Sequence, residues 1–170
     1  IAIVDDHKLI RQLWEKMFAG NKDMVLTGEA GTLDEAVAMI GIKRPDIVLL
    51  DITLEDESGM DAVPLIRRLS PGTKIIAVSM HNQPAYAKRM LQLGAKGYVT
   101  KNSAYAEMVK AIQEVMKGNE YVCTEIKDRL ADHATDIDFN QPGIKDLSFR
   151  EIGIIKLMKE GLTSKEIAVQ

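Results

Sequence analysis

The segment DIVLLDITLEDESGMD (residues 46–61) combines an apolar run with a group of acidic residues. Its apolar run, residues 47–50, is typical of a strand buried in a parallel sheet. The run leads directly into Asp51, and further acids follow at Glu55, Asp56, Glu57 and Asp61. A buried strand that delivers a carboxylate into so acidic a neighbourhood calls for a chemical explanation.

Strand-like and helix-like segments alternate on both sides of this stretch. Apolar runs of strand length occupy residues 1–4, 24–30, 46–50, 74–79 and 97–100. Segments with helical periodicity follow them at residues 8–19, 32–42, 59–69, 83–93 and 103–117, and Thr32 with Glu35 forms a capping box. The alternation predicts an α/β fold, a five-stranded doubly wound parallel sheet with helices on both faces.

Composition and charge exclude several classes of protein. The chain has 170 residues, of which 46% are hydrophobic and 28% charged, and a net charge of −3, so no global basic field indicates nucleic acid or an anionic membrane. The single cysteine, Cys123, cannot form an internal disulfide, and no apolar run approaches the roughly 20 residues that span a bilayer. We therefore expect a cytoplasmic protein.

Polar and charged residues stand where the predicted strands end. Asp5 and Asp6 end the first strand, Asp51 the third and Ser79 the fourth, and Lys101 follows the fifth. In a parallel sheet these carboxyl ends share one edge, where such folds bind their ligands. Each acid alone would be an ordinary turn or cap residue; the complete set indicates a site.

Three carboxylates at one edge repel one another. At about 5 Å and an effective dielectric near 20, each pair of like charges costs about 3 kcal/mol. Mg²⁺ suits such a site because it needs only one or two carboxylates and keeps several waters. With the ammonium of Lys101 and the hydroxyl of Ser79, the site has the groups that phosphoryl transfer requires.

The stretches IVDDH (3–7), PDIVLLDITLEDESGMD (45–61), IIAVSMH (75–81) and GAKGYVTKNS (94–103) resemble the receiver domain of two-component response regulators. The resemblance covers residues 1–118 and implies a flavodoxin-like strand order of 2-1-3-4-5. It makes Asp51 the phosphoacceptor and a Mg²⁺ ligand, with Asp6 as a direct ligand and Asp5 as an indirect one. It also implies that the backbone carbonyl of Thr53 binds the metal and that Ser79 and Lys101 contact the phosphoryl group. Tyr98 would be the aromatic that swings inward on activation.

One position departs from the family pattern. Many receivers have a proline after the lysine, with a cis peptide bond before it, whereas this chain has Asn102. Because a cis bond before a residue other than proline costs about 3 kcal/mol, we expect a trans peptide here.

The chain after the receiver divides into two further segments. Residues 119–143 are acidic and predict a linker, with a possible short helix at 124–134 that has Ile126 and Leu130 on one side. Residues 144–170 contain LSFREIGIIKLMKEGLTSKEIA (147–168), which resembles the first two helices of the LuxR/NarL-type DNA-binding domain. The recognition helix that would follow is absent, so we expect DNA binding from the parent protein and not from this fragment.

These observations predict a response regulator that a sensor histidine kinase phosphorylates on Asp51 in a Mg²⁺-dependent reaction. We expect no enzymatic activity beyond self-catalysed phosphorylation and autodephosphorylation. We also expect a phosphorylation-dependent homodimer, formed through the face of the fourth helix, fifth strand and fifth helix or through the first helix.

Two alternatives remain. One is a Mg²⁺-dependent phosphohydrolase with Asp51 as nucleophile. It would usually need a second acid two residues on, where this chain has Thr53. The other is a receiver that acts only through protein–protein contacts, which the LuxR-type segment disfavours.

Overall fold

A computed structural model describes residues 1–54 and 58–132, with the backbone only at 131 and 132. The compact unit Ile1–Asp132 contains all of the described residues and extends beyond residue 118, the predicted end of the receiver. The predicted DNA-binding segment, 144–170, and most of the predicted linker lie outside the described residues.

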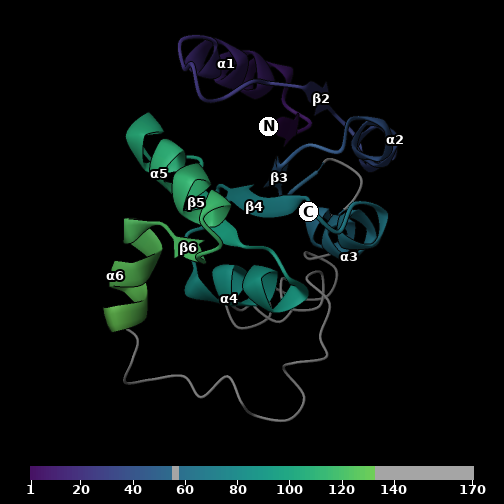
Figure 1. Ribbon diagram of the computed structural model, residues 1–170. Coiled ribbons are helices and arrows are strands. Elements are labelled where there is room, and N and C mark those ends of the chain that lie inside the picture. The colour runs from purple at the N-terminus through teal and green to yellow at the C-terminus, as the bar shows by residue number, and fades with distance from the viewer. Residues whose placement is uncertain (55–57, 133–170) are drawn as a thin grey trace, which may run out of the picture. The chain divides into compact units, whose positions relative to one another are not determined.

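A parallel sheet forms the centre of this unit (Figure 1). Its order is β2-β1-β3-β4-β5-β6, so the predicted fold class and the order of the first five strands are confirmed. The prediction missed the sixth strand, which is only two residues long and pairs with Gly97 and Tyr98 of β5. The strands are β1 (Ala2–Val4), β2 (Gly28–Ala30), β3 (Ile47–Asp51), β4 (Lys74–Ser79), β5 (Gly97–Thr100) and β6 (Tyr121–Val122).

Helices cover both faces of the sheet, with α1 and α5 on one side and α2, α3 and α4 on the other (Figure 1). The Thr32 hydroxyl caps α2 by accepting a hydrogen bond from the Glu35 amide at 3.2 Å, as the capping box predicts. The Glu35 carboxylate accepts from the amide of Gly31. The helices are α1 (Lys8–Ala19), α2 (Leu33–Lys43), α3 (Gly59–Leu69), α4 (Pro84–Leu93), α5 (Tyr105–Met116) and α6 (Thr124–Asp132).

The last helix, α6, confirms the short helix predicted within 124–134. Ile126 is fully buried, but Leu130, predicted on the same side, is 45% exposed. Together with β6, the helix packs onto the end of the sheet beside α4 (Figure 1). Part of the predicted linker therefore belongs to the compact unit.

The core explains why β3 reads as a continuous apolar run. All five residues of β3 are buried, because helices cover both faces of the sheet at this central position. The apolar stripe of α5 and the stacked rings of Trp14 and Phe18, 5.8 Å apart, pack on one face. The strand thus carries its terminal residue, Asp51, into a buried position at the edge of the sheet.

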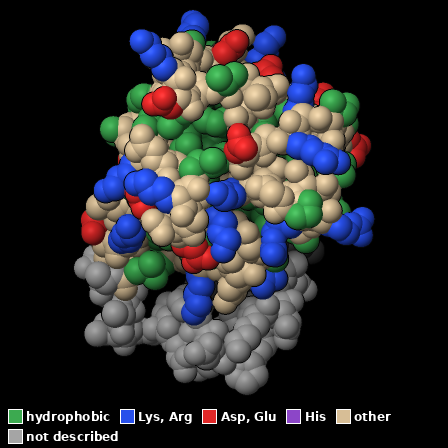
Figure 2. Space-filling view, viewed as in Figure 1, with side chains coloured by type: hydrophobic (Ala, Val, Ile, Leu, Met, Phe, Trp, Pro, Cys, Tyr) green, Lys and Arg blue, Asp and Glu red, His purple; other side chains and the backbone are tan. Residues whose placement is uncertain are grey.

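The surface carries charges of both signs, as the composition predicts. Figure 2 shows lysine and arginine side chains spread over the described part of this face, with acidic side chains among them. Among the described residues, no helix combines the length and the apolar character needed to cross a membrane.

Candidate functional site

Two buried aspartates form the centre of the site at the carboxyl edge of the sheet. Asp51, the last residue of β3, is 2% exposed, and Asp5, directly after β1, is 3% exposed. Each carboxylate accepts one backbone hydrogen bond at 2.9 Å, from Thr53 to Asp51 and from His7 to Asp5. Because β1 and β3 are neighbouring parallel strands, residues distant in sequence meet here.

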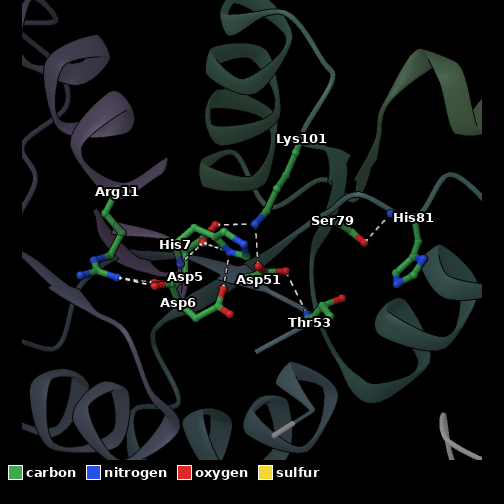
Figure 3. A network of polar contacts seen from close by, with 9 residues as sticks. All are labelled: Asp5, Asp6, His7, Arg11, Asp51, Thr53, Ser79, His81 and Lys101. Atoms are coloured by element: carbon green, nitrogen blue, oxygen red, sulfur yellow. Dashed lines mark hydrogen bonds and ion pairs between the residues drawn. The ribbon is translucent and has the colours of Figure 1, made fainter. Parts of the chain in front are cut away.

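Lys101 bridges the two aspartates. Its Nζ lies 2.7 Å from Asp5 Oδ2 and 2.6 Å from Asp51 Oδ2, and its side chain is 9% exposed (Figure 3). Burial lowers the pKa of this ammonium, but the hydrogen bonds with both carboxylates outweigh that effect, so the pKa is raised above its usual value. Lys101 is therefore held in its charged form.

The carboxylates outnumber this single ammonium. Burial raises the pKa of Asp51, and the nearby charge of Asp5 acts in the same direction, although Lys101 and the amide of Thr53 oppose the shift. Asp51 therefore holds its proton more tightly than an exposed aspartate would, chiefly because it is buried.

Asp6 and His7 complete the cluster on its more exposed side. The His7 Nδ1 lies 2.6 Å from Asp6 Oδ1 and 3.5 Å from Asp5 Oδ1. One ligand atom from each of four residues, Asp5, Asp6, His7 and Asp51, falls within a group no more than 4.8 Å across. Oxygen ligands with excess negative charge, two of them buried, fit a hard divalent cation such as Mg²⁺.

The predicted switch residues lie beside this cluster, but their polar groups bond elsewhere. The Ser79 hydroxyl, at the end of β4, accepts a hydrogen bond from the His81 amide at 2.9 Å and is turned toward His81 (Figure 3). Tyr98 is fully buried and donates from its hydroxyl to the carbonyl oxygen of His81 at 2.8 Å, and burial raises its pKa. The aromatic ring predicted to swing inward already lies inside.

The backbone around the site agrees with the sequence. The described residues contain no cis peptide bond, so the bond before Asn102 is trans, as expected. Thr53 directs its amide to Asp51, and its side chain is exposed.

Two further residues position the site and were not predicted from the sequence. The Nη1 of Arg11 donates to the carbonyl oxygens of Asp5 and Asp6 at 2.7 and 3.3 Å and so fixes the backbone that carries both acids. Gly59, at the start of α3, packs so tightly that a Cβ there would overlap the carbonyl oxygen of Asp51. Arg11 lies one helical turn after His7, and this spacing could have indicated its contact with the acidic pair. Nothing in the sequence indicated the close approach of Gly59.

A parallel sheet of this order, with an acidic cluster and a bridging lysine at its carboxyl edge, defines the receiver class of signalling domains. The family described as the response regulator receiver domain matches residues 1–113. The chain belongs to this family, and its relatives are response regulators of the LuxR/NarL type.

Individual proteins show the same likeness. The chain is 33% identical to the response regulator GacA of Pseudomonas viridiflava over 91% of this chain and 72% of that protein. It is 31% identical to the oxygen regulatory protein NreC of Staphylococcus haemolyticus over 99% of this chain and 80% of that protein. Among solved structures, a LuxR-family two-component response regulator from Aurantimonas sp. SI85-9A1 matches with a TM-score of 0.75 and 30% identity. That match covers 79% of this chain and 96% of the other.

Proposed function

We propose that Asp51 accepts a phosphoryl group from a sensor histidine kinase and thereby switches the output of a DNA-binding transcription regulator. One observation carries this assignment: Asp51 is a buried strand-end carboxylate in direct contact with Lys101 and next to two further aspartates. A structural salt bridge would need one carboxylate for one ammonium. The surplus of acids fits a site that gains positive charge from a ligand.

The residues divide the chemistry among themselves. Asp6, Asp51 and the backbone carbonyl of Thr53 would hold Mg²⁺ directly, and Asp5 would hold it indirectly. When bound, this ion neutralises the acids and the incoming phosphoryl oxygens. An Asp51 oxygen forms the new bond to phosphorus as the bond from phosphorus to the donor nitrogen breaks. Lys101 and Ser79 then contact the transferred phosphoryl group, and hydrolysis of the acyl phosphate resets the site.

The output of the protein follows from the rest of the chain. The LuxR-type sequence at 147–168 supports DNA binding by the parent protein in the cytoplasm. Phosphorylation would favour a homodimer. The α1 surface suits this role better than the α4 side, since Leu9 and Leu13 are exposed one turn apart on α1 while α6 packs beside α4.

Intact-mass measurement tests the assignment. The protein is incubated with Mg²⁺ and acetyl phosphate, and a gain of about 80 Da is expected for one phosphoryl group. The gain should disappear in Asp51→Asn and after removal of Mg²⁺. It should persist in Asp61→Asn, which changes an exposed acid on α3 in the same way. A gain that survives Asp51→Asn would refute the assignment.

A further inference from the structure

The loop between β4 and α4 is tied to its surroundings at successive residues. Its first tie is the hydrogen bond from the His81 amide to the Ser79 hydroxyl, and its second runs from the Tyr98 hydroxyl to the His81 carbonyl. The third is made by the next residue, Asn82, whose Nδ2 donates to Glu125 Oε1 at 3.1 Å. The loop therefore connects the phosphoryl-contact hydroxyl of Ser79 to a side chain of α6.

Glu125 makes a second contact, with the carboxyl end of β5. Its Oε2 accepts a hydrogen bond at 2.9 Å from the hydroxyl of Thr100, which is buried and directly precedes Lys101. One carboxylate thus joins α6 to the β4–α4 loop through Asn82 and to the end of β5 through Thr100. We refer to Glu125, Asn82 and Thr100 as the Glu125 lock.

Another glutamate also holds α6, but it has no link to the loop. Glu107 of α5 accepts hydrogen bonds from the Thr124 amide and hydroxyl, at 2.7 and 2.9 Å. These bonds satisfy the start of α6, and buried Ile126 anchors the helix in the core. Because these contacts already dock α6, the Glu125 lock adds a connection to the two segments beside Ser79 and Lys101.

We propose that Glu125 is a positioning residue: through the Glu125 lock, α6 and the Ser79 loop each set the conformation of the other. This inference rests on the proposed function of Asp51. A phosphoryl group on Asp51 draws the Ser79 hydroxyl toward itself, the loop follows, and the Asn82 amide leaves Glu125. The hold on α6 weakens, so the state of Asp51 is transmitted to the chain that follows α6. By linkage, loosening the Glu125 lock favours the phosphorylated conformation.

Hydrogen exchange of the full chain, without ligand, tests the lock itself. Glu125→Ala should raise exchange of the loop amides at 80–83 by roughly ten-fold, as expected when charge-assisted hydrogen bonds are lost. Asn82→Ala changes no residue of α6, but it should raise exchange of the α6 amides because it removes the hydrogen bond from the loop to Glu125. Glu107→Ala removes bonds that do not reach the loop, so it should loosen the start of α6 and change loop exchange much less than Glu125→Ala does. Asp128→Asn, an exposed acid on the same helix, should affect neither segment.

A second arm adds Mg²⁺ and beryllium fluoride, which mimics the phosphoryl group. In the wild type, exchange of the α6 amides should rise several-fold, whereas Glu125→Ala should show no further rise. Unchanged loop exchange in Glu125→Ala, or the same loop response in Glu107→Ala, would overturn the proposal. So would a wild-type α6 that is unaffected by bound beryllium fluoride. If neither beryllium fluoride nor a phosphoryl group attaches to Asp51, the proposed function fails, while the lock is still decided by the ligand-free arm.

Discussion

The two halves of the carboxyl edge differ in how well their polar groups are satisfied. At the ends of β1 and β3, three carboxylates lie close together, and the ammonium of Lys101 contacts only the two that are buried. At the ends of β4 and β5, the hydroxyls of Ser79, Tyr98 and Thr100 each have a hydrogen-bond partner within the chain.

This difference separates binding from response. The β1–β3 half carries a surplus of negative charge, which a bound cation would relieve. The β4–β5 half has no such imbalance and must break an existing hydrogen bond before it moves. We therefore expect the receiver to stay in one state until a phosphoryl oxygen accepts a hydrogen bond from the Ser79 hydroxyl.

The largest expected effect comes from making the imbalance worse. Lys101→Met removes the ammonium that bridges the two buried carboxylates, and without Mg²⁺ it should lower the free energy of unfolding by about 3 kcal/mol. Urea unfolding measures the change, and added Mg²⁺ should recover part of it. Lys96→Met, which breaks an exposed pair with Glu120, should cost less than about 1 kcal/mol. Equal losses in the two variants would contradict the imbalance.

A smaller effect is expected from disturbing the geometry of the β1–β3 half alone. Gly59→Ala introduces a Cβ that overlaps the Asp51 carbonyl, so α3 must shift, and unfolding should become easier by about 2 kcal/mol. Isothermal titration should also show weaker Mg²⁺ binding. Gly72→Ala is the matched control, because a Cβ there meets no atom within 4 Å. If both alanines are tolerated equally, Gly59 does not position Asp51.

The smallest effect concerns pH. The pKa of Asp51 in the folded state is raised above its ordinary value of 3.8. At a pH between 3.8 and the folded pKa, the folded state therefore binds more protons than the unfolded state. The Asp51 contribution to stability is therefore fully present below pH 3.8 and is lost as the pH rises through the folded pKa. Urea unfolding across this range, without Mg²⁺, should show wild-type stability falling relative to Asp51→Asn. A rise relative to the variant would mean that folding lowers the pKa of Asp51.

The arrangement of the β1–β3 half could be predicted from the sequence, and that of the β4–β5 half only in part. Asp6, Asp51 and Lys101 meet because the ends of parallel strands share one edge, which is a consequence of topology alone. The directions of the Ser79 and Tyr98 hydroxyls depend on the backbone of His81, which no residue pattern encodes. Similarly, β6 is too short to show a period, so the docking of α6 could not be foreseen.

The response of stability to Mg²⁺ at pH 7 shows whether the β1–β3 half is a cation site. Without metal, Asp51→Asn should be more stable than the wild type by about 1 kcal/mol, because it removes one charge of the surplus. With Mg²⁺ at ten times its dissociation constant, the wild type should gain about 1.4 kcal/mol of stability and the variant much less. The difference in stability between the two proteins should therefore shrink or change sign. If both proteins respond equally, or neither responds, the β1–β3 half is not a cation site.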